Sequence, residues 1–187
     1  QGVSSVEKAR IFHEAMEKYE SVLGKYPRSD WVDDALYNKA WAIIHLSDIE
    51  DEYTRADALP LFERIVAEHP GGDYGAASQF TLGDYYYGDH QYDLATASYQ
   101  KFLDNFPQES LKAKDRSLPR KARVLLGHLS EIEAYEVYAT GEALFDAQSY
   151  VEAIEIFADV IERFPESSQA VNAVVNIASA YMAQEEY

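Results

Sequence analysis

The sequence predicts an all-α protein in which helical hairpins stack as an α-solenoid. Three observations support this: a recurring proline, an aromatic residue eight positions before it, and an alanine four positions before the aromatic residue. The four sets are Ala15, Tyr19 and Pro27; Ala58, Phe62 and Pro70; Ala95, Tyr99 and Pro107; and Ala153, Phe157 and Pro165. Spacings of three and four place residues on one face of an α-helix, which we expect to be buried, and a proline ends the helix.

A second helix is expected in each unit, because a small residue recurs thirteen positions after three of the prolines. These small residues are Ala40, Gly83 and Ala178, and Gly141 holds the equivalent place twelve positions before Ala153. Two helices in each period of roughly 30–50 residues are typical of an α-solenoid, in which each hairpin buries its apolar face by stacking on the next.

We expect a single array over residues 1–187, interrupted by one long insertion. The predicted segments are the second helix of a partial repeat at about 3–26, repeats at about 28–70, 71–107 and 108–165, an insertion at about 108–132, and the first helix of a final repeat at 166–187. A solenoid end without its capping helix exposes an apolar face. The chain is therefore interpreted as a piece of a longer protein.

The order of residues within a unit resembles the tetratricopeptide repeat. The residues that carry the resemblance most fully are Leu82, Gly83, Tyr86, Ala95, Tyr99, Phe102 and Pro107. The closing pattern aromatic-Pro-x-Ser, at residues 26–29 and 164–167, resembles the subgroup of this family found in bacterial envelope proteins. The resemblance implies a right-handed α-solenoid that serves as a protein-interaction scaffold in a cell-envelope assembly complex. It also implies the periplasm or the periplasmic face of the outer membrane, with the cytoplasm as the alternative.

Net charge, the length of apolar runs and the cysteine content each exclude a class of partner or site. The formal net charge is −17, so the protein lacks the excess of basic residues that neutralises nucleic-acid phosphates, and we expect no nucleic-acid partner. No apolar run approaches the roughly 20 residues of a membrane-spanning helix. There is no cysteine, so disulfides and thiolate metal sites are excluded for these residues.

Catalytic and metal-binding patterns are not found in the sequence. The histidines are His13, His45, His69, His90 and His128, and no two of them are three or four residues apart. No nucleophile and base stand at a recognisable spacing. We therefore expect neither an enzyme nor a bound cofactor or metal.

The resemblance implies a ligand-binding concave face, lined by the first helix of each pair. Its exposed positions lie three residues before and one, four and five residues after the small residue. The candidate groove residues are Tyr37, Trp41, Ile44, His45, Phe80, Asp84, Tyr87, Tyr138, Glu142, Phe145, Asp146 and Met182. Aromatic rings with carboxylates fit a peptide segment or helix that carries apolar and basic side chains. The alternative is that these aromatic residues only pack between hairpins.

The insertion holds a local excess of positive charge. Its basic residues are Lys112, Lys114, Arg116, Arg120, Lys121 and Arg123. One interpretation is charge balance against the neighbouring acidic repeats. The other is a docking patch for an acidic partner or for anionic lipid headgroups, which would give peripheral membrane association.

The sequence thus favours a non-catalytic protein–protein interaction scaffold. Two alternatives stay open. The first is a structural spacer or self-associating solenoid that joins copies through uncapped ends, and the second is a helical accessory arm of a larger enzyme.

Overall fold

The structure is a computed structural model that describes residues 4–185. Within these residues it contains eight α-helices, three short 3₁₀-helices and no strand, which confirms the all-α prediction. The first residue of the predicted partial repeat, at position 3, and the end of the predicted final helix, at 186–187, lie outside the described residues.

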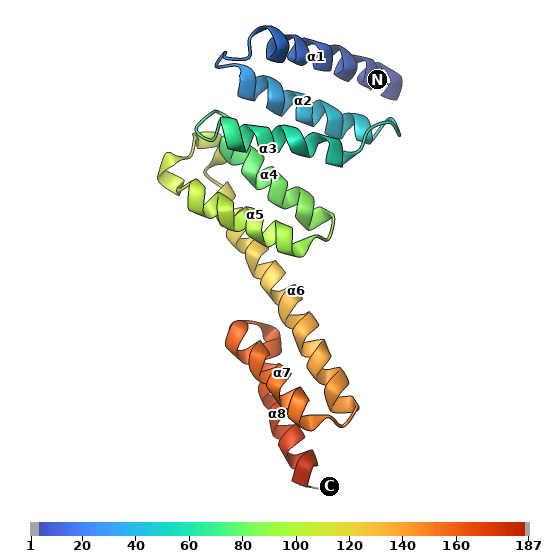
Figure 1. Ribbon diagram of the computed structural model, residues 1–187, viewed down its shortest axis with the longest axis vertical. Coiled ribbons are helices and arrows are strands. Elements are labelled where there is room, and N and C mark those ends of the chain that lie inside the picture. Colours follow the sequence, from blue (N-terminus) through green and yellow to red (C-terminus); the bar gives the residue numbers. More distant parts are fainter. Residues whose placement is uncertain (1–3, 186–187) are drawn as a thin grey trace. The chain divides into compact units, whose positions relative to one another are not determined.

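The chain divides into two compact units, Gln1–Ala122 and Arg123–Tyr187. The first unit contains five consecutive helices, and each packs against the next (Figure 1). These helices are α1 (Ser5–Lys25), α2 (Val32–Ser47), α3 (Leu59–Glu68), α4 (Gly75–Gly88) and α5 (Tyr92–Asn105). The insertion after α5 carries two 3₁₀-helices, η2 (Gln108–Ser110) and η3 (Ala113–Asp115), and α3 is preceded by η1 (Arg55–Ala58).

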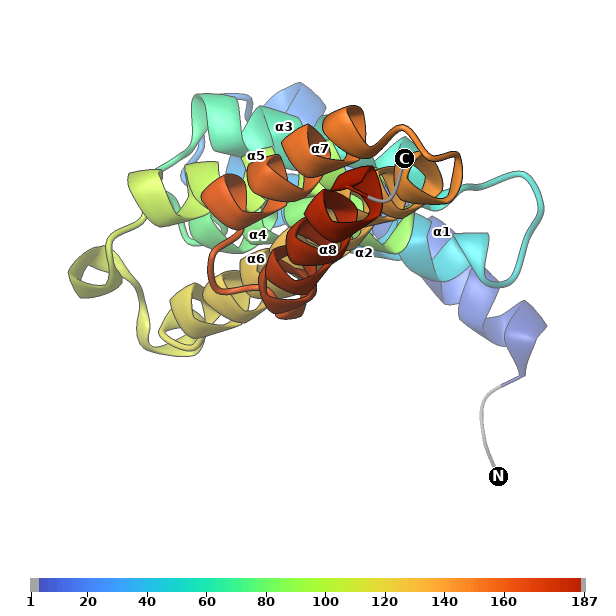
Figure 2. The ribbon, with the colours of Figure 1, turned by 90° about the horizontal axis from the view of Figure 1, so that it is seen from below.

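The second unit is built from α6 (Leu118–Asp146), whose first residues belong to the first unit, followed by α7 (Tyr150–Arg163) and α8 (Ser168–Glu185). Helices α7 and α8 lie side by side in both views (Figures 1 and 2). No helix among residues 4–185 is both long and apolar enough to cross a membrane.

Four helices end in the same way, at the residue before a proline. The backbone N–H of Tyr26, His69, Phe106 and Phe164 donates to the carbonyl four residues earlier, at 2.8–3.0 Å. The following proline has no N–H and restricts the residue before it to extended backbone, so the helix cannot continue. Helix starts are also encoded locally: Ser4 accepts a hydrogen bond from the N–H of Glu7 at 3.2 Å.

The aligned small residues lie where two helices approach most closely. A Cβ atom added at Gly83 would lie 2.6 Å from the ring of Tyr99, and one added at Gly141 would lie 2.6 Å from the ring of Phe157. Both rings are fully buried. Tyr99 and Phe157 therefore pack directly on the backbone of the preceding helix, and a glycine leaves the space for each ring.

Candidate functional site

Five aromatic rings form a continuous row that joins α1, α2 and the residue before α4. Phe12 stacks on His45, with ring centroids 5.0 Å apart, and Tyr37 stacks on Tyr74 at 4.1 Å. Trp41 lies between these pairs, 6.1 Å from His45 and 6.3 Å from Tyr37. We call these five residues the aromatic row. His45 is exposed and the other four rings are half-buried, so each keeps surface that a ligand can contact.

The four predicted groove residues of α2 divide between the row and the core. Tyr37, Trp41 and His45 belong to the row, whereas Ile44 is half-buried and packs against the core cluster. Tyr37 and Trp41 also rest edge-on against the buried ring of Phe62, at 5.8 and 6.3 Å. These rings therefore combine core packing with an accessible surface.

Two members of the row, Phe12 and Tyr74, are absent from the predicted set. Phe12 stands three residues before the repeat alanine, and the same position holds Tyr92 and Tyr150 in two later units. Each of these rings contacts a predicted groove ring, at centroid distances of 5.0, 6.2 and 5.3 Å. The contacted rings are His45, Tyr87 and Phe145, respectively. This recurring aromatic position is the sequence signal that identifies Phe12. Tyr74 stands four residues after Pro70, as Trp31 stands four residues after Pro27, and this position was not part of the predicted groove pattern.

The basic insertion reaches the Tyr74 end of the row. The amino group of Lys114 lies 3.7 Å from the centroid of the Tyr74 ring, and Lys112 forms an ion pair with Asp73. The Lys112–Asp73 pair agrees with charge balance inside the protein, whereas Lys114 makes a cation–π contact. The remaining basic residues of the predicted patch are exposed: Arg116, Arg120, Lys121 and Arg123. Their role in docking stays a prediction.

The predicted groove residues of α4 lie in different environments. Phe80 is only 6% exposed and packs on Tyr99 and Phe102, so its ring belongs to the hairpin core and is not available to a ligand. The spacing predicts an exposed groove position for Phe80, but Phe80 and Gly83, three residues apart, lie on the same helix face and both face Tyr99 of α5. Tyr87 is half-buried, while Asp84 retains solvent access and accepts a hydrogen bond from the Tyr99 hydroxyl at 2.6 Å.

The Asp84–Tyr99 contact changes the acidity of both groups. Burial raises the pKa of the Asp84 carboxyl above its ordinary range, and the hydrogen bond from Tyr99 lowers it in part. Burial raises the pKa of the Tyr99 hydroxyl, and the neighbouring carboxylate raises it further. The Tyr99 hydroxyl donates to the Asp84 carboxylate, so this pair links α4 and α5.

In the second unit, too, some predicted groove residues are buried in the core and others stay accessible. Tyr138 is 8% exposed and packs on Phe157, which again places a predicted groove ring in the core. Its hydroxyl accepts a hydrogen bond from the Asn176 side chain in α8 at 2.8 Å. Burial raises the pKa of this hydroxyl, and the nearby Glu142 raises it further.

The other predicted residues of the second unit remain accessible. Glu142 and Asp146 are exposed, Phe145 is half-buried, and Met182 is 71% exposed. The prediction of one groove across α2, α4, α6 and α8 combines residues of both units and stays a prediction. Within the described residues, no group of three or more histidine and acidic side chains is placed to hold a metal ion.

Comparisons with known proteins identify the repeats. Residues 77–109 and 137–167 match the family model of the tetratricopeptide repeat. The outer membrane protein assembly factor BamD of Neisseria gonorrhoeae is 27% identical over 150 residues, which are 79% of this chain and 52% of that protein. BamD from Neisseria meningitidis serogroups A and B has the same identity and coverage. The chain therefore spans about half the length of the curated relatives that it matches.

Proposed function

Because this chain is a tetratricopeptide-repeat protein that resembles BamD, we propose that it is a non-catalytic scaffold for protein–protein contacts in the assembly of outer membrane proteins. The name of its relatives, outer membrane protein assembly factor, supports this pathway, and we propose the periplasmic face of the outer membrane as the location. The expectation that the chain is not an enzyme agrees with the character of the family.

The observation that carries the proposal is the aromatic row. Partly accessible aromatic rings anchored on a rigid core are the type of surface that provides most of the binding energy in protein interfaces. Tryptophan and tyrosine offer a large contact area at a low cost in side-chain entropy. We propose that Trp41 and His45 contact the ligand directly, with Tyr37 and Tyr74 as a supporting wall.

The ligand class follows from charge. With a net charge of −17, the protein attracts cationic partners and repels anionic ones at long range. Asp84 on α4 and Glu142 and Asp146 on α6 place carboxylates at predicted groove positions of the two units. We propose that the ligand is a peptide segment or helix with apolar and basic side chains, and that each unit offers its own surface to it.

The two tryptophans provide a matched test. Trp41 belongs to the row, whereas Trp31 precedes α2 and is 68% exposed. A labelled peptide that alternates lysine with leucine is titrated with the parent, Trp41→Ala and Trp31→Ala proteins, and fluorescence anisotropy gives the dissociation constants. We expect saturable binding that weakens about tenfold or more in Trp41→Ala, since truncation of an interface anchor costs about 2 kcal/mol. Trp31→Ala keeps the parent affinity.

Two results would contradict the proposed ligand class: equal loss of affinity in both tryptophan variants, or equal binding of a peptide that alternates glutamate with leucine. Circular dichroism first establishes that both variants are folded. In cells, a photo-crosslinking amino acid at position 45 is compared with one at position 31. Crosslinks from position 45 to outer membrane proteins or their assembly partners support the pathway. Crosslinks only to further copies of this chain favour the self-associating solenoid.

A further inference from the structure

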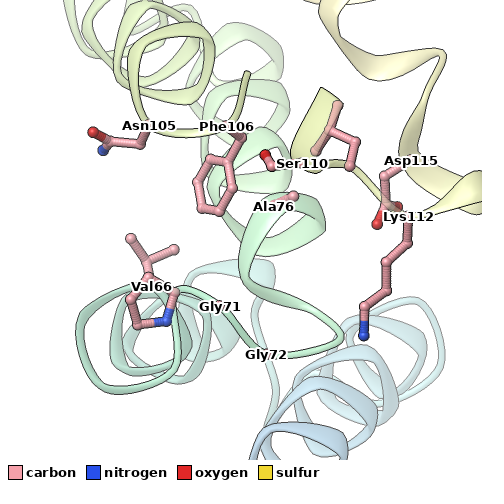
Figure 3. A pocket seen from close by; sticks show the side chains of 11 residues that line it. Val66, Gly71, Gly72, Ala76, Asn105, Phe106, Ser110, Lys112 and Asp115 are labelled. Carbon is pink, nitrogen blue, oxygen red and sulfur yellow. The ribbon is translucent and has the colours of Figure 1, made fainter. Parts of the chain in front are cut away.

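A pocket of about 550 Å³ lies in the first unit, and its lining includes none of the predicted groove residues. Figure 3 shows that its lining comes from the end of α3, the turn before α4, the end of α5 and the insertion. Val66, Ala76 and Phe106 supply apolar walls, and Lys112 and Asp115 line the side formed by the insertion. A pocket of this volume is within the roughly 300–1,000 Å³ range of ligand sites in proteins.

The insertion builds this pocket and is fastened to the repeats at several points. Leu111 is buried, and Lys112 pairs with Asp73. The turn that contains Asp73 is in turn held to α2, because the buried carboxylate of Asp33 accepts a hydrogen bond from the N–H of Asp73 at 2.7 Å. A second contact is the amino group of Lys114 over the Tyr74 ring. The insertion, which forms this wall of the pocket, is therefore held in place by specific contacts. Its residues lie outside the repeat pattern.

Asp115 is the unusual residue of the pocket. It is only 7% exposed, yet its carboxylate has no hydrogen bond and no ion pair within the described part of the chain. Burial raises its pKa, while Lys114 and Lys112 lower it from a distance. Neither oxygen of Asp115 is among the fully enclosed side-chain atoms that lack a partner, so the carboxylate opens onto the pocket that it lines. A carboxylate that opens onto a pocket and has no partner in the protein is a candidate for binding a cationic group.

We propose that this pocket binds an arginine or lysine side chain of a partner protein, with Asp115 as its counter-charge. The apolar walls suit the methylene stem of such a side chain. The amino group of Lys112 pairs with Asp73 and that of Lys114 lies over the Tyr74 ring, so neither forms an ion pair with Asp115, although their charges lower its pKa. An incoming guanidinium would give Asp115 the charge-assisted hydrogen bonds that the folded chain lacks.

The pocket is a second binding site beside the aromatic row. The charge of Asp115 contributes to the raised pKa of Tyr37 and of Tyr74, so its carboxylate lies near that end of the row. A partner segment could therefore occupy both, but the pocket proposal does not depend on the function proposed for the row. It adds a specificity element: a requirement for one basic side chain at a defined place in the partner.

Two peptides that differ only in charge test the proposal. The probes are N-acetyl-Leu-Arg-Leu-amide and its analogue with citrulline, which has nearly the shape of arginine but no charge. Both are titrated into ¹⁵N-labelled protein, and amide chemical shifts give the dissociation constants and the location. We expect the arginine peptide to bind about tenfold more tightly and to shift amides of the turn at 71–73 and of residues 110–115.

Variants assign the preference to the carboxylate. At the pocket amides, Asp115→Asn should bind both peptides equally, whereas Glu109→Gln, an exposed acidic residue of the same insertion, should keep the preference there. Urea unfolding first establishes that Asp115→Asn remains folded. If Asp115→Asn does not fold, Ser110→Arg replaces it: an arginine tethered at the pocket lining should abolish binding of the arginine peptide.

The proposal is overturned by equal binding of the two peptides to the parent, by an arginine preference that survives in Asp115→Asn, or by shifts confined to α2. Trp41→Ala separates the two sites, because it should weaken binding at the aromatic row and leave the arginine preference unchanged. Loss of the preference in Trp41→Ala would place the arginine at the row and contradict the assignment to Asp115.

Discussion

The hairpins α4–α5 and α6–α7 use the same packing contact with different polar atoms. Each has an aromatic residue on its first helix, a glycine three positions later, and a second aromatic residue that packs on both. The ring centroids are 5.4 Å apart for Phe80 and Tyr99 and also 5.4 Å apart for Tyr138 and Phe157. These two hairpins contain the segments that match the repeat model. The packing of the two rings is therefore nearly the same in both hairpins.

The tyrosine hydroxyl changes place between the two hairpins. In α4–α5 it belongs to Tyr99 on the second helix and donates to Asp84 of the same hairpin. In α6–α7 it belongs to Tyr138 on the first helix and accepts from Asn176 of the next helix, α8. One hydroxyl thus stabilises its own hairpin and the other fastens a hairpin to the following repeat. The comparison teaches that the packed rings hold the two helices of a hairpin together, while the position of the hydroxyl determines which further pair of helices is joined by a hydrogen bond.

The largest expected effect comes from filling the space at the two glycines. Gly83→Ala and Gly141→Ala should each destabilise the protein by about 1–3 kcal/mol, because the new methyl group overlaps a fully buried ring that cannot move away freely. Urea unfolding gives the free energies, and hydrogen exchange shows which hairpin opens. Equal geometry predicts similar losses in the two hairpins.

Gly127 of α6 is the matched control for this experiment. A Cβ atom there meets nothing within 4 Å, so Gly127→Ala should stabilise the helix by up to about 1 kcal/mol through helix propensity alone. A gain in stability at Gly83 or Gly141 would mean that the ring contacts are looser than the structure indicates.

A smaller effect is expected from removing each hydroxyl. Tyr99→Phe should cost about 1 kcal/mol, because Asp84 loses a donor inside its hairpin. Tyr138→Phe should cost about 0.5 kcal/mol, since half-buried Asn176 can bind water instead. Hydrogen exchange distinguishes the two: amides of α4 and α5 should exchange faster in Tyr99→Phe, and amides of α8 in Tyr138→Phe. If the amides of α8 do not exchange faster in Tyr138→Phe, the inter-repeat role of Tyr138 is contradicted.

The smallest effect is a pH dependence that only the α4–α5 hairpin should show. The Asp84 carboxyl has a raised pKa in the folded protein, so the folded state holds its proton more tightly than the unfolded state does. Stability should therefore fall as pH rises from the ordinary value of 3.8 through the higher folded value. Urea unfolding of the parent and of Asp84→Asn at several pH values from 3.8 upward measures this change in the free energy of unfolding. The parent should lose stability relative to the variant with rising pH, and a relative gain would contradict the assignment.

Some features of the site could be predicted from repeat spacing and others could not. Spacing places Trp41 and His45 on one helix face, and both belong to the aromatic row. It also selects Phe80 and Tyr138, which the structure buries. Tyr37, at the equivalent position of α2, also packs on an aromatic ring, that of Phe62, yet stays half-buried. Exposure of this position therefore depends on the whole tertiary environment and is not encoded by the spacing itself.

The insertion was the part least accessible to sequence reasoning. Its basic residues suggested a patch, but the pairing of Lys112 with Asp73 and the burial of Asp115 depend on contacts between segments about forty residues apart. A segment outside the repeat pattern has no aligned neighbour from which its packing could be inferred.

By itself, the sequence determined the helical hairpins, their ends and their glycine contacts. Helix periodicity, proline and the need for space beneath a buried ring all act over a few residues or recur in every unit. The tertiary structure alone decided which aromatic rings stay accessible, which lysines are occupied and where an unpartnered carboxylate is buried. These outcomes depend on the free energy of contacts between distant segments, which local sequence does not specify.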